Sequence, residues 1–401
     1  MSTYLFGFHS EKVQTLLDFI PKKFIFDNMI KRFLTDVIKS KLFKGKAIIL
    51  MGARQVGKTT VLRNIFEKET QLLWLNGDEL DVQELFANAS ADRLKSIFGN
   101  HKIVIIDEAQ RIADVGLRLK LITDNLPNIQ LIATGSSSFE LANKINEPLT
   151  GRKWEYKMFP LSFGEMVAHH GLLTEKRLLR HRMVYGYYPD IVNSQGEEKE
   201  LLKQLSDSYL YKDILMWEQI QKPDKLLKLL QALAYQLGSQ VSYHELGQLC
   251  GLDSKTVEKY ILLLEQTFVI FRLGSFSRNL RNELKSSKKI YFYDNGIRNA
   301  LIANFSEVEN RTDVGALWEN FLVGERIKHI NYSNNWVNFW FWRTKAQKEI
   351  DFIEEADGKI NAYEFKWNES KKAKAPISFL NAYPDSTYKV VHPQNFEDFI
   401  S

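Results

Sequence analysis

Residues 47–62 read AIILMGARQVGKTTVL, and this stretch decides the fold. It holds Gly52, Gly57, Lys58 and Thr59 at the spacing G-x4-G-K-[ST], between an apolar strand pattern and a helical pattern. Glycines let the backbone wrap an anion, so that N–H groups and the following helix's amino end face phosphate oxygens. Lys58 then reaches the β- and γ-phosphates, and the Thr59 hydroxyl ligates Mg²⁺. The predicted ATP-binding residues are Gly52, Ala53, Arg54, Gln55, Val56, Gly57, Lys58, Thr59 and Thr60.

A second motif lies at residues 103–108, which read IVIIDE. Four apolar residues predict a strand, with Asp107 and Glu108 at its carboxyl end. We expect Asp107 to hold Mg²⁺ with Thr59, directly or through water, and Glu108 to polarise the attacking water. The second acid favours hydrolysis over simple nucleotide binding. The alternative is that both acids only cap the next helix.

Three further polar residues are candidates for sensing the γ-phosphate. Thr134 and Ser136 end the apolar run in LIATGSSS, and we expect one of them to lie between the two acids. The alternative is a polar strand end that begins a turn. Arg152, in PLTGR, is a candidate γ-phosphate sensor or arginine finger, against the alternative of a surface arginine. The candidate catalytic residues are therefore Lys58, Glu108 and Arg152.

Composition excludes several classes of protein. The 401 residues are 44% hydrophobic and 26% charged, which excludes a disordered or collagenous chain and allows two to four domains. Cys250 is the single cysteine, which excludes an internal disulfide and a structural zinc finger. The longest apolar run, 260–273, is broken by Glu265 and Gln266, and the N-terminus lacks a signal-like run. We therefore expect a cytoplasmic protein without a membrane span.

The first half of the chain alternates strand and helix patterns. Strands that are apolar on both faces, with helices between them, predict an α/β domain with a buried parallel sheet. The predicted strands are Ala47–Met51, Leu72–Leu75, Ile103–Ile106 and Ile129–Ala133.

Residues 225–273 predict three helices and a DNA-binding geometry. The expected helices are Lys225–Leu237, Tyr243–Cys250 and Ser254–Gln266, with a turn at residues 251–253. A short helix, a three-residue turn containing glycine and a second helix is typical of a helix-turn-helix. The second helix exposes Lys255 and Lys259.

A basic stretch follows these helices. Residues 272–289 carry six basic residues and one acid, a net charge of +5 that equals the net charge of the whole chain. A basic hairpin after a helix-turn-helix favours a wing on a nucleic-acid backbone. The alternatives are that the domain packs against the ATPase or binds a protein. The predicted nucleic-acid patch is Lys255, Lys259, Arg272, Arg278, Arg281, Lys285, Lys288 and Lys289.

Residues 349–367 read EIDFIEEADGKINAYEFKW, which predicts a β-hairpin. Asp-Gly between two alternating runs favours a two-residue turn at residues 357–358. This register sets Asp351 opposite Glu364 and Glu349 opposite Lys366, and turns the aromatic face into the core. Two facing carboxylates repel each other unless a divalent cation lies between them. The alternative is a solvated face on which Lys366 forms ion pairs with Glu349 and Asp351.

The spacing Asp-x12-Glu-x-Lys resembles the PD-(D/E)xK nuclease superfamily. The resemblance implies an α/β restriction-endonuclease-like fold, a possible second divalent metal and a nuclease-like site of Glu319, Asp351, Glu364 and Lys366. In it Lys366 would orient a metal-bound water or stabilise a phosphate transition state. Metal-dependent cleavage and binding without cleavage both remain open.

The ordered motifs together resemble a family of prokaryotic AAA-type ATPases. In this family a winged helix and a C-terminal domain of unknown function, with a restriction-endonuclease-like fold, follow the P-loop domain. The residues that carry the resemblance are GARQVGKTT, IVIIDEAQ, LIATGSSS, PLTGR with FPLSFGEM, GYYPDIV, LWEN, FWR, EIDF and YEFKW. The resemblance implies ATP and Mg²⁺ as cofactors and allows homo-oligomers in which an arginine reaches a neighbour's γ-phosphate.

The predicted organisation has four parts. They are an N-terminal extension (1–25), an AAA-type P-loop domain (26–200), an all-α winged helix-turn-helix domain (201–290) and a nuclease-like α/β domain (291–401). We expect a Mg²⁺-dependent ATPase that couples nucleotide state to a DNA- or RNA-facing module. The alternative is a nucleotide-switched protein-interaction scaffold or regulator without nuclease activity.

Overall fold

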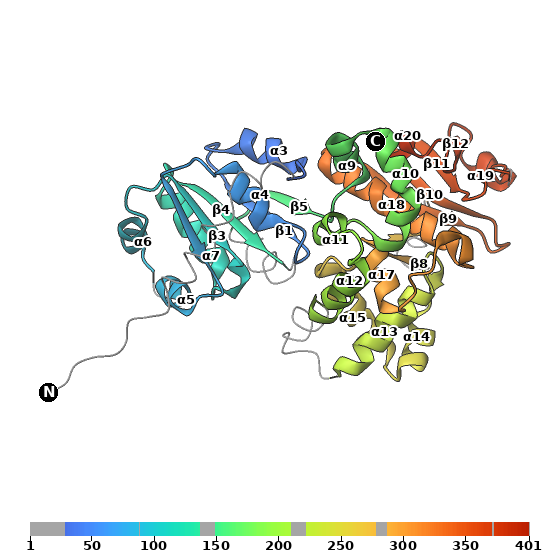
Figure 1. Cartoon of the computed structure of the whole chain (residues 1–401), viewed down its shortest axis with the longest axis horizontal. Helices are drawn as coiled ribbons and strands as arrows, with labels where there is room; N and C mark the ends of the chain where they lie inside the picture. The colour runs from blue at the N-terminus through green and yellow to red at the C-terminus, as the bar shows by residue number, and fades with distance from the viewer. Residues whose placement is uncertain are drawn as a thin grey trace.

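The described chain forms two lobes (Figure 1). The computed structural model describes residues 29–87, 89–136, 149–209, 222–277, 287–370 and 373–400. We call the described part of 29–158 the N-terminal lobe and that of 159–400 the C-terminal lobe. The predicted N-terminal extension lies outside the described residues.

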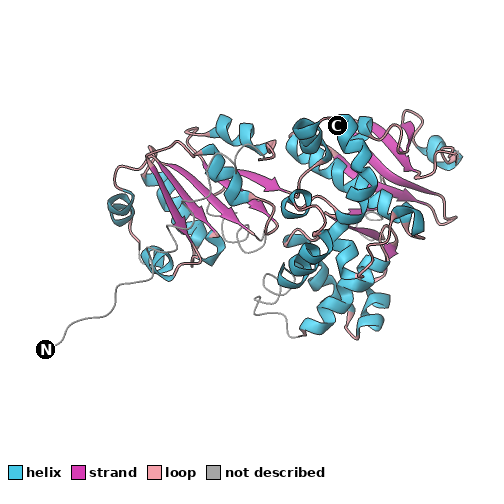
Figure 2. Ribbon diagram, viewed as in Figure 1, coloured by secondary structure: helices cyan, strands magenta, loops and turns pink. Residues whose placement is uncertain are grey.

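A five-stranded parallel sheet forms the centre of the N-terminal lobe (Figure 2). Its strands in spatial order are β2 (Leu72–Asn76), β3 (Ile103–Asp107), β4 (Gln130–Gly135), β1 (Ala47–Gly52) and β5 (Lys153–Met158). Around it lie α3 (Leu34–Lys41), α4 (Lys58–Ile65), α5 (Leu80–Ala87), α6 (Ala91–Phe98) and α7 (Val115–Asn125). Because β1, β3 and β4 are buried along their whole length, they read as continuous apolar runs. The α/β class and the four predicted strands are confirmed, and β5 is an added edge strand.

The strand order determines what meets at the carboxyl edge of this sheet. Because β4 lies between β1 and β3, three neighbouring strands end side by side. The phosphate loop follows β1, Thr134 belongs to the end of β4, and Asp107 is the last residue of β3. In parallel α/β sheets this edge is where ligands bind.

The chain leaves the N-terminal lobe directly after β5. The next helices are α9 (Phe163–His170), α10 (Leu172–Tyr185), α11 (Pro189–Asn193) and α12 (Glu198–Tyr209). Both α10 and α12 pack against α17 (Asn295–Leu301) of the C-terminal lobe. The predicted end of the ATPase domain at residue 200 is therefore wrong by about forty residues, because these helices bury their apolar faces away from the parallel sheet.

The next unit combines three helices with a small sheet. Its elements in chain order are α13 (Pro223–Tyr235), β6 (Gln240–Val241), α14 (Tyr243–Cys250), α15 (Ser254–Gln266), β7 (Ile270–Gly274) and β8 (Lys288–Phe292). The Asp253 carboxylate caps α15 by accepting a hydrogen bond from the Thr256 N–H at 2.9 Å. The three predicted helices are confirmed. The expected all-α character is wrong, because the antiparallel sheet β6-β8-β7 belongs to this unit.

The C-terminal unit is a four-stranded sheet covered by α18 (Val314–Tyr332). Its other elements are β9 (Asn338–Arg343), β10 (Glu349–Ala356), β11 (Lys359–Phe365), α19 (Ile377–Ala382), β12 (Thr387–Val391) and α20 (Glu397–Ile400). The sheet order is β12-β11-β10-β9. Pairing of Ala356 with Lys359 confirms the predicted hairpin register, and positive φ values at Asp357 (50°) and Gly358 (76°) fit a type I′ turn. No helix among the described residues is both long and apolar enough to span a membrane.

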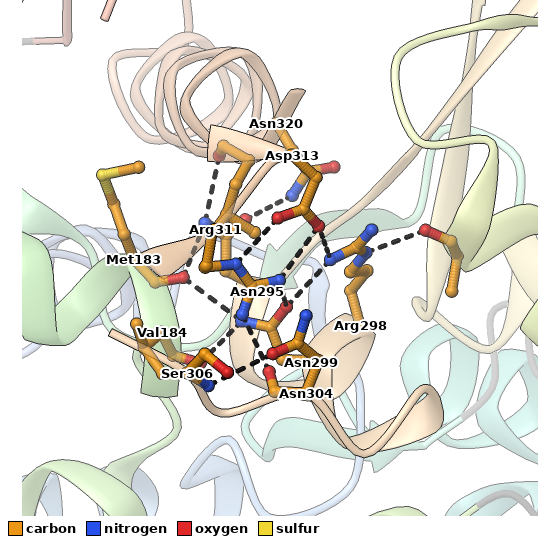
Figure 3. Close-up of polar contacts among 12 residues, drawn as sticks. Met183, Val184, Asn295, Arg298, Asn299, Asn304, Ser306, Arg311, Asp313 and Asn320 are labelled. Carbon is orange, nitrogen blue, oxygen red and sulfur yellow. Dashed lines mark hydrogen bonds and ion pairs between the residues drawn. The ribbon is translucent and has the colours of Figure 1, made fainter. Parts of the chain in front are cut away.

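A buried polar network fixes α10, α17 and α18 to one another (Figure 3). The Asn295 amide donates to the carbonyl oxygens of Met183 and Leu317, both at 3.1 Å. The Asp313 carboxylate accepts from Arg298 at 2.6 Å and from Arg311. Because each buried polar group has partners on another element, the network specifies how these helices meet.

Asn320→Leu should destabilise the C-terminal lobe by about 2–4 kcal/mol, because it leaves two buried backbone groups unpaired. The Asn320 side chain accepts from the Phe292 N–H at 2.7 Å and donates to the Phe292 carbonyl oxygen at 3.0 Å. Urea unfolding followed by far-UV circular dichroism measures the loss. The control is Asn331→Ala on the same helix, whose amide donates to the Ile327 carbonyl oxygen one turn away. Equal effects of the two changes would contradict this role for Asn320.

Candidate nucleotide-binding site

The phosphate loop is shaped by its glycines. Gly57 has φ 95°, a left-handed conformation that favours glycine. A Cβ on Gly52 would lie 2.1 Å from the Met158 carbonyl oxygen, so only glycine allows β1 and β5 to end this close together. The Lys58 ammonium is buried and donates to the carbonyl oxygens of Gly52 and Ala53, both at 2.8 Å. The lysine is therefore held over the concave side of the loop.

Asp107 is held between hydroxyl groups from two other elements. The Thr59 hydroxyl donates to Asp107 Oδ2 at 2.8 Å, and the Thr134 hydroxyl donates to Oδ1. The Glu108 N–H donates to Thr134 Oγ1 at 3.2 Å. Thr134 thus lies between the two acids, where we expected one of the two sensor candidates.

A second chain of hydrogen bonds orients Glu108. The Gln110 amide donates to Glu108 Oε2 at 2.6 Å and to the Ser136 hydroxyl at 3.0 Å. Glu108 precedes a short 3-10 helix, but its side chain makes no capping hydrogen bond. The alternative that Glu108 caps this helix is therefore wrong.

The donors at Thr59 and Asp107 fit Mg²⁺. They are a hydroxyl oxygen and a carboxylate oxygen in direct contact, which is the protein part of the ligand set that Mg²⁺ takes beside phosphates. Among the described residues no three His, Cys, Asp or Glu side chains are arranged as a metal site. A Mg²⁺ ion bound largely by phosphates and water does not need such a group.

Two adjoining pockets flank the phosphate loop. The first, about 490 Å³, is polar and is lined by residues that include Lys58, Asp78, Glu108 and Asp190. The second, about 310 Å³, is more apolar. Its lining includes Met29, Ile30, Val56, Val61, Leu161 and Asn193. Both pockets include Gly57, Thr60 and Pro189 in their walls, so they form one cleft with a phosphate side and a side suited to a purine base.

Arg152 does not reach this cleft. It directly precedes β5 at the amino edge of the sheet, where its carbonyl accepts from the Ala47 N–H. Six residues of β1 separate this edge from the phosphate loop, a distance of roughly 17–20 Å. Its guanidinium forms an exposed ion pair with Asp124 at 2.5 Å. The prediction that Arg152 acts catalytically on the nucleotide of its own chain is therefore wrong, and the surface alternative describes its position.

Sequence reasoning missed three residues of the cleft region. Pro189 and Asp190 begin α11 and close the cleft from the C-terminal lobe. They belong to the GYYPDIV motif, which contributes to the family resemblance but to which the sequence assigns no function. Arg32 borders the base side and bonds the Val56 carbonyl oxygen. It is one basic residue among several in KRFLTDVIKSK, so no local pattern distinguishes it.

The four predicted nuclease-like residues converge at one place in the C-terminal lobe. Burial raises the pKa of Asp351 well above its usual range, and the charges of Glu319 and Glu364 raise it further. The Lys366 ammonium bonds Glu364 Oε1 at 2.6 Å. The alternative of a solvated hairpin face is wrong, because Glu319 of α18 and Lys289 of β8 enclose this face.

Lys289 occupies the centre of this acidic group. Its ammonium lies 2.9 Å from Glu319 Oε1 and 2.5 Å from Glu349 Oε1, and the Tyr291 hydroxyl also bonds Glu319, at 2.6 Å. The side chain is 2% exposed, so its charge belongs to the site and not to the surface. The assignment of Lys289 to the nucleic-acid patch is therefore wrong. As arranged, the acids bind an ammonium group and do not fit a divalent cation.

The other predicted patch residues fall into three groups. Lys255 and Lys259 are exposed on α15, and Lys288 is half-buried on β8. Arg272 forms an ion pair with Glu265 at 2.5 Å, and this pair raises the pKa of its guanidinium although burial opposes the rise. The remaining three lie outside the described residues: Arg278, Arg281 and Lys285.

Comparison with known families divides the chain into three parts. Residues 44–167 match a family described as AAA domain, residues 176–308 match Domain of unknown function (DUF8612), and residues 314–398 match Domain of unknown function (DUF4143). The AAA match ends close to the observed lobe boundary.

Similarity over about four-fifths of the chain extends to proteins that are themselves uncharacterized. An uncharacterized protein of Mycobacterium tuberculosis is 24% identical over 333 residues, which cover 82% of this chain and 72% of that protein. An uncharacterized protein of Methanocaldococcus jannaschii is 23% identical over 368 residues, which cover 82% of this chain and 81% of that protein. Among solved structures, the Walker-type ATPase of Pyrococcus abyssi aligns with 69% of this chain and 97% of its own, with TM-score 0.48 and 14% identity. The family match and the parallel sheet with its phosphate loop together make the N-terminal lobe an AAA-type P-loop domain.

Proposed function

We propose that this protein binds and hydrolyses ATP with Mg²⁺ and transmits the nucleotide state to its C-terminal lobe. The observation that carries the proposal is the hydrogen-bonded set of Thr59, Asp107, Thr134 and Glu108 beside the phosphate loop. The appended domains and the paired acids favour hydrolysis over phosphoryl transfer to a small molecule.

Each residue has a defined task in this reaction. Lys58 exchanges its loop carbonyl partners for phosphate oxygens and stabilises the charge that develops on the γ-phosphate. Thr59 and Asp107 would hold Mg²⁺, which neutralises charge between the β- and γ-phosphates. Glu108, oriented by Gln110, accepts a hydrogen bond from the attacking water and polarises it.

Lys58→Ala should abolish ATP hydrolysis, whereas Glu108→Gln should keep ATP binding and lower kcat by about 10²–10⁴-fold, as expected for loss of a general base. Phosphate release measures kcat, and a fluorescent ATP analogue measures binding. The control is Glu84→Gln on the exposed face of α5, which should behave as wild type. A Lys58→Ala protein that hydrolyses ATP at the wild-type rate would overturn the proposal.

We further propose that the C-terminal lobe contacts nucleic acid through a winged helix. Support comes from the order helix, strand, helix, helix, strand, strand over residues 223–292, which is the order of that domain type. The two lysines of α15, Lys255 and Lys259, are exposed and available for phosphate contacts.

Lys255→Ala with Lys259→Ala should weaken binding of double-stranded DNA and lower the salt slope by about two, near 0.9 per lost phosphate contact. Fluorescence anisotropy between 50 and 200 mM salt measures both quantities. The matched control is Lys199→Ala with Lys203→Ala, two exposed lysines of α12. Equal loss in both double variants would count against the winged helix. Nucleotide-dependent capture of a protein partner without DNA binding would favour the scaffold alternative.

We propose that the nuclease-like domain binds nucleic acid and does not cleave it. The order helix, three strands, helix, strand over residues 314–391 supports a restriction-endonuclease-like fold. The buried Lys289 ammonium between Glu319 and Glu349 supports loss of the metal-dependent chemistry, because it already neutralises the acids that a cation would need.

The wild-type protein should leave single- and double-stranded DNA and RNA intact in Mg²⁺ or Mn²⁺, with and without ATP. Gel electrophoresis of labelled oligonucleotides is the measurement. Cleavage that disappears in Asp351→Ala and Lys366→Ala while ATP turnover persists would restore the nuclease hypothesis. A trace of cleavage that survives both changes is contamination and leaves the proposal standing.

A further inference from the structure

Arg32 connects the phosphate loop to the C-terminal lobe. Its guanidinium is buried and donates to three separate segments of the chain. Nη1 donates to the Val56 carbonyl oxygen at 2.5 Å, Nη2 to the Phe159 carbonyl oxygen at 2.6 Å, and Nε to Glu165 Oε1 at 3.0 Å. The Tyr332 hydroxyl lies 3.5 Å from Nη2.

These partners belong to separate parts of the molecule. Val56 lies within the phosphate loop, Phe159 follows β5, Glu165 belongs to α9, and Tyr332 is the last residue of α18. The Tyr332 hydroxyl also accepts from the Phe159 N–H at 3.1 Å, and its ring packs edge-on against Phe159. The start of the C-terminal lobe and the end of α18 therefore meet at this guanidinium.

Arg32 holds the backbone of the loop from the apolar side of the cleft, which it also lines. Val56 lies between Gln55 and Gly57, which both have positive φ values, 57° and 95°. By accepting from Arg32, the Val56 carbonyl is fixed in an orientation that this unusual backbone requires. A loop that is already held in one conformation loses less conformational entropy when a nucleotide binds.

The charge of Arg32 is fully compensated. Glu165 accepts from Arg32 and from the N–H groups of Phe33 and Ser162, at 2.9 and 3.0 Å, and forms the capping box of α9. Burial by itself lowers the pKa of Arg32, but Glu165 and Tyr332 raise it, so the guanidinium stays charged. Lysine keeps the charge but lacks the planar set of donors that reaches several partners.

We propose that Arg32 is a positioning residue that holds the phosphate loop ready for ATP and, through Tyr332, links the loop to α18. This inference rests on the proposed ATP site. It assigns the route by which the nucleotide state reaches the C-terminal lobe.

The first test is the affinity for a fluorescent ATP analogue. Arg32→Lys should raise Kd at least tenfold, because the Val56 and Phe159 contacts are not both kept. Tyr332→Phe should leave Kd within about threefold of wild type, because it removes only the hydroxyl link to α18. The matched control is Lys31→Ala, the exposed neighbour of Arg32, which should leave Kd unchanged. Wild-type Kd in Arg32→Lys overturns the proposal.

The second test is amide hydrogen exchange, with and without ATP. In wild type, ATP should slow exchange in residues 52–59 and also in residues 326–332. Tyr332→Phe should keep the first response and lose the second, a pattern that a merely stabilising contact does not give. Retention of both responses in Tyr332→Phe overturns the link.

Exchange without nucleotide separates this inference from the proposed ATP site. Arg32→Lys should speed exchange in both segments together, whether or not the protein binds ATP, and Lys31→Ala should not. Unchanged exchange in either segment overturns the proposal. A wild-type protein that fails to bind ATP while showing this linked change refutes the proposed function and keeps the role of Arg32 in holding the loop.

Discussion

The arrangement of the two lobes depends on the buried ion pair between Arg32 and Glu165. Two charges removed from water are tolerated only when they pair and their remaining hydrogen-bonding groups are satisfied, and both conditions hold here. Arg32 bonds both the phosphate loop and Glu165, so the ion pair holds α9, the first helix after β5, close to the loop. The Lys328 ammonium then bonds the Leu161 carbonyl oxygen at 2.9 Å, and Glu325 accepts from the Phe163 N–H at 2.7 Å. The motif FPLSFGEM is therefore the joint between the lobes, which explains why the boundary lies near residue 158.

This joint places the nucleotide cleft where it can affect both lobes. One wall is the phosphate loop with Met29, Ile30 and Arg32, and the other is the start of α11 with Pro189 and Asp190. A ligand shifts a conformational equilibrium only through contacts that differ between the states. A nucleotide that touches α11 makes such contacts, since α11 belongs to the lobe that carries the three-stranded sheet and the acidic site. The polar network around Asn295 and Asp313 fixes α10, α17 and α18 together, so a displacement at α11 is carried by a packed unit.

The sequence predicts features that depend on residues close together in the chain, and it misses roles that depend on residues far apart in the chain. Some features follow from local patterns with spacings of fewer than about twenty residues. They are the phosphate loop, the acids Asp107 and Glu108 at the end of β3, the helix pair α14 and α15, and the hairpin register. Arg32, Arg152 and Lys289 have roles set by residues more than about twenty positions away. Arg152 belongs to the PLTGR motif, but it lies at the amino edge of the sheet, whereas the phosphate loop lies at the carboxyl edge. Lys289 follows Lys288 in a strand that is apolar on both faces, so alternation does not tell which lysine turns inward.

Because Lys289 points inward, less of the positive charge of residues 272–289 is available at the surface than the sequence suggests. The basic stretch 272–289 has a net charge of +5, but Lys289 is neutralised by Glu319 and Glu349, and Arg272 is paired with Glu265. Of the eight predicted patch residues, these two are already paired, three more are described as exposed or half-buried, and the other three lie outside the described residues. For the DNA binding proposed above, at most six phosphate contacts would give a salt slope of about −5, where eight contacts would give about −7. The proposed nucleic-acid contact would consequently be weaker and less salt-sensitive than the sequence charge suggests, and among the described residues it would rest on Lys255 and Lys259 of α15.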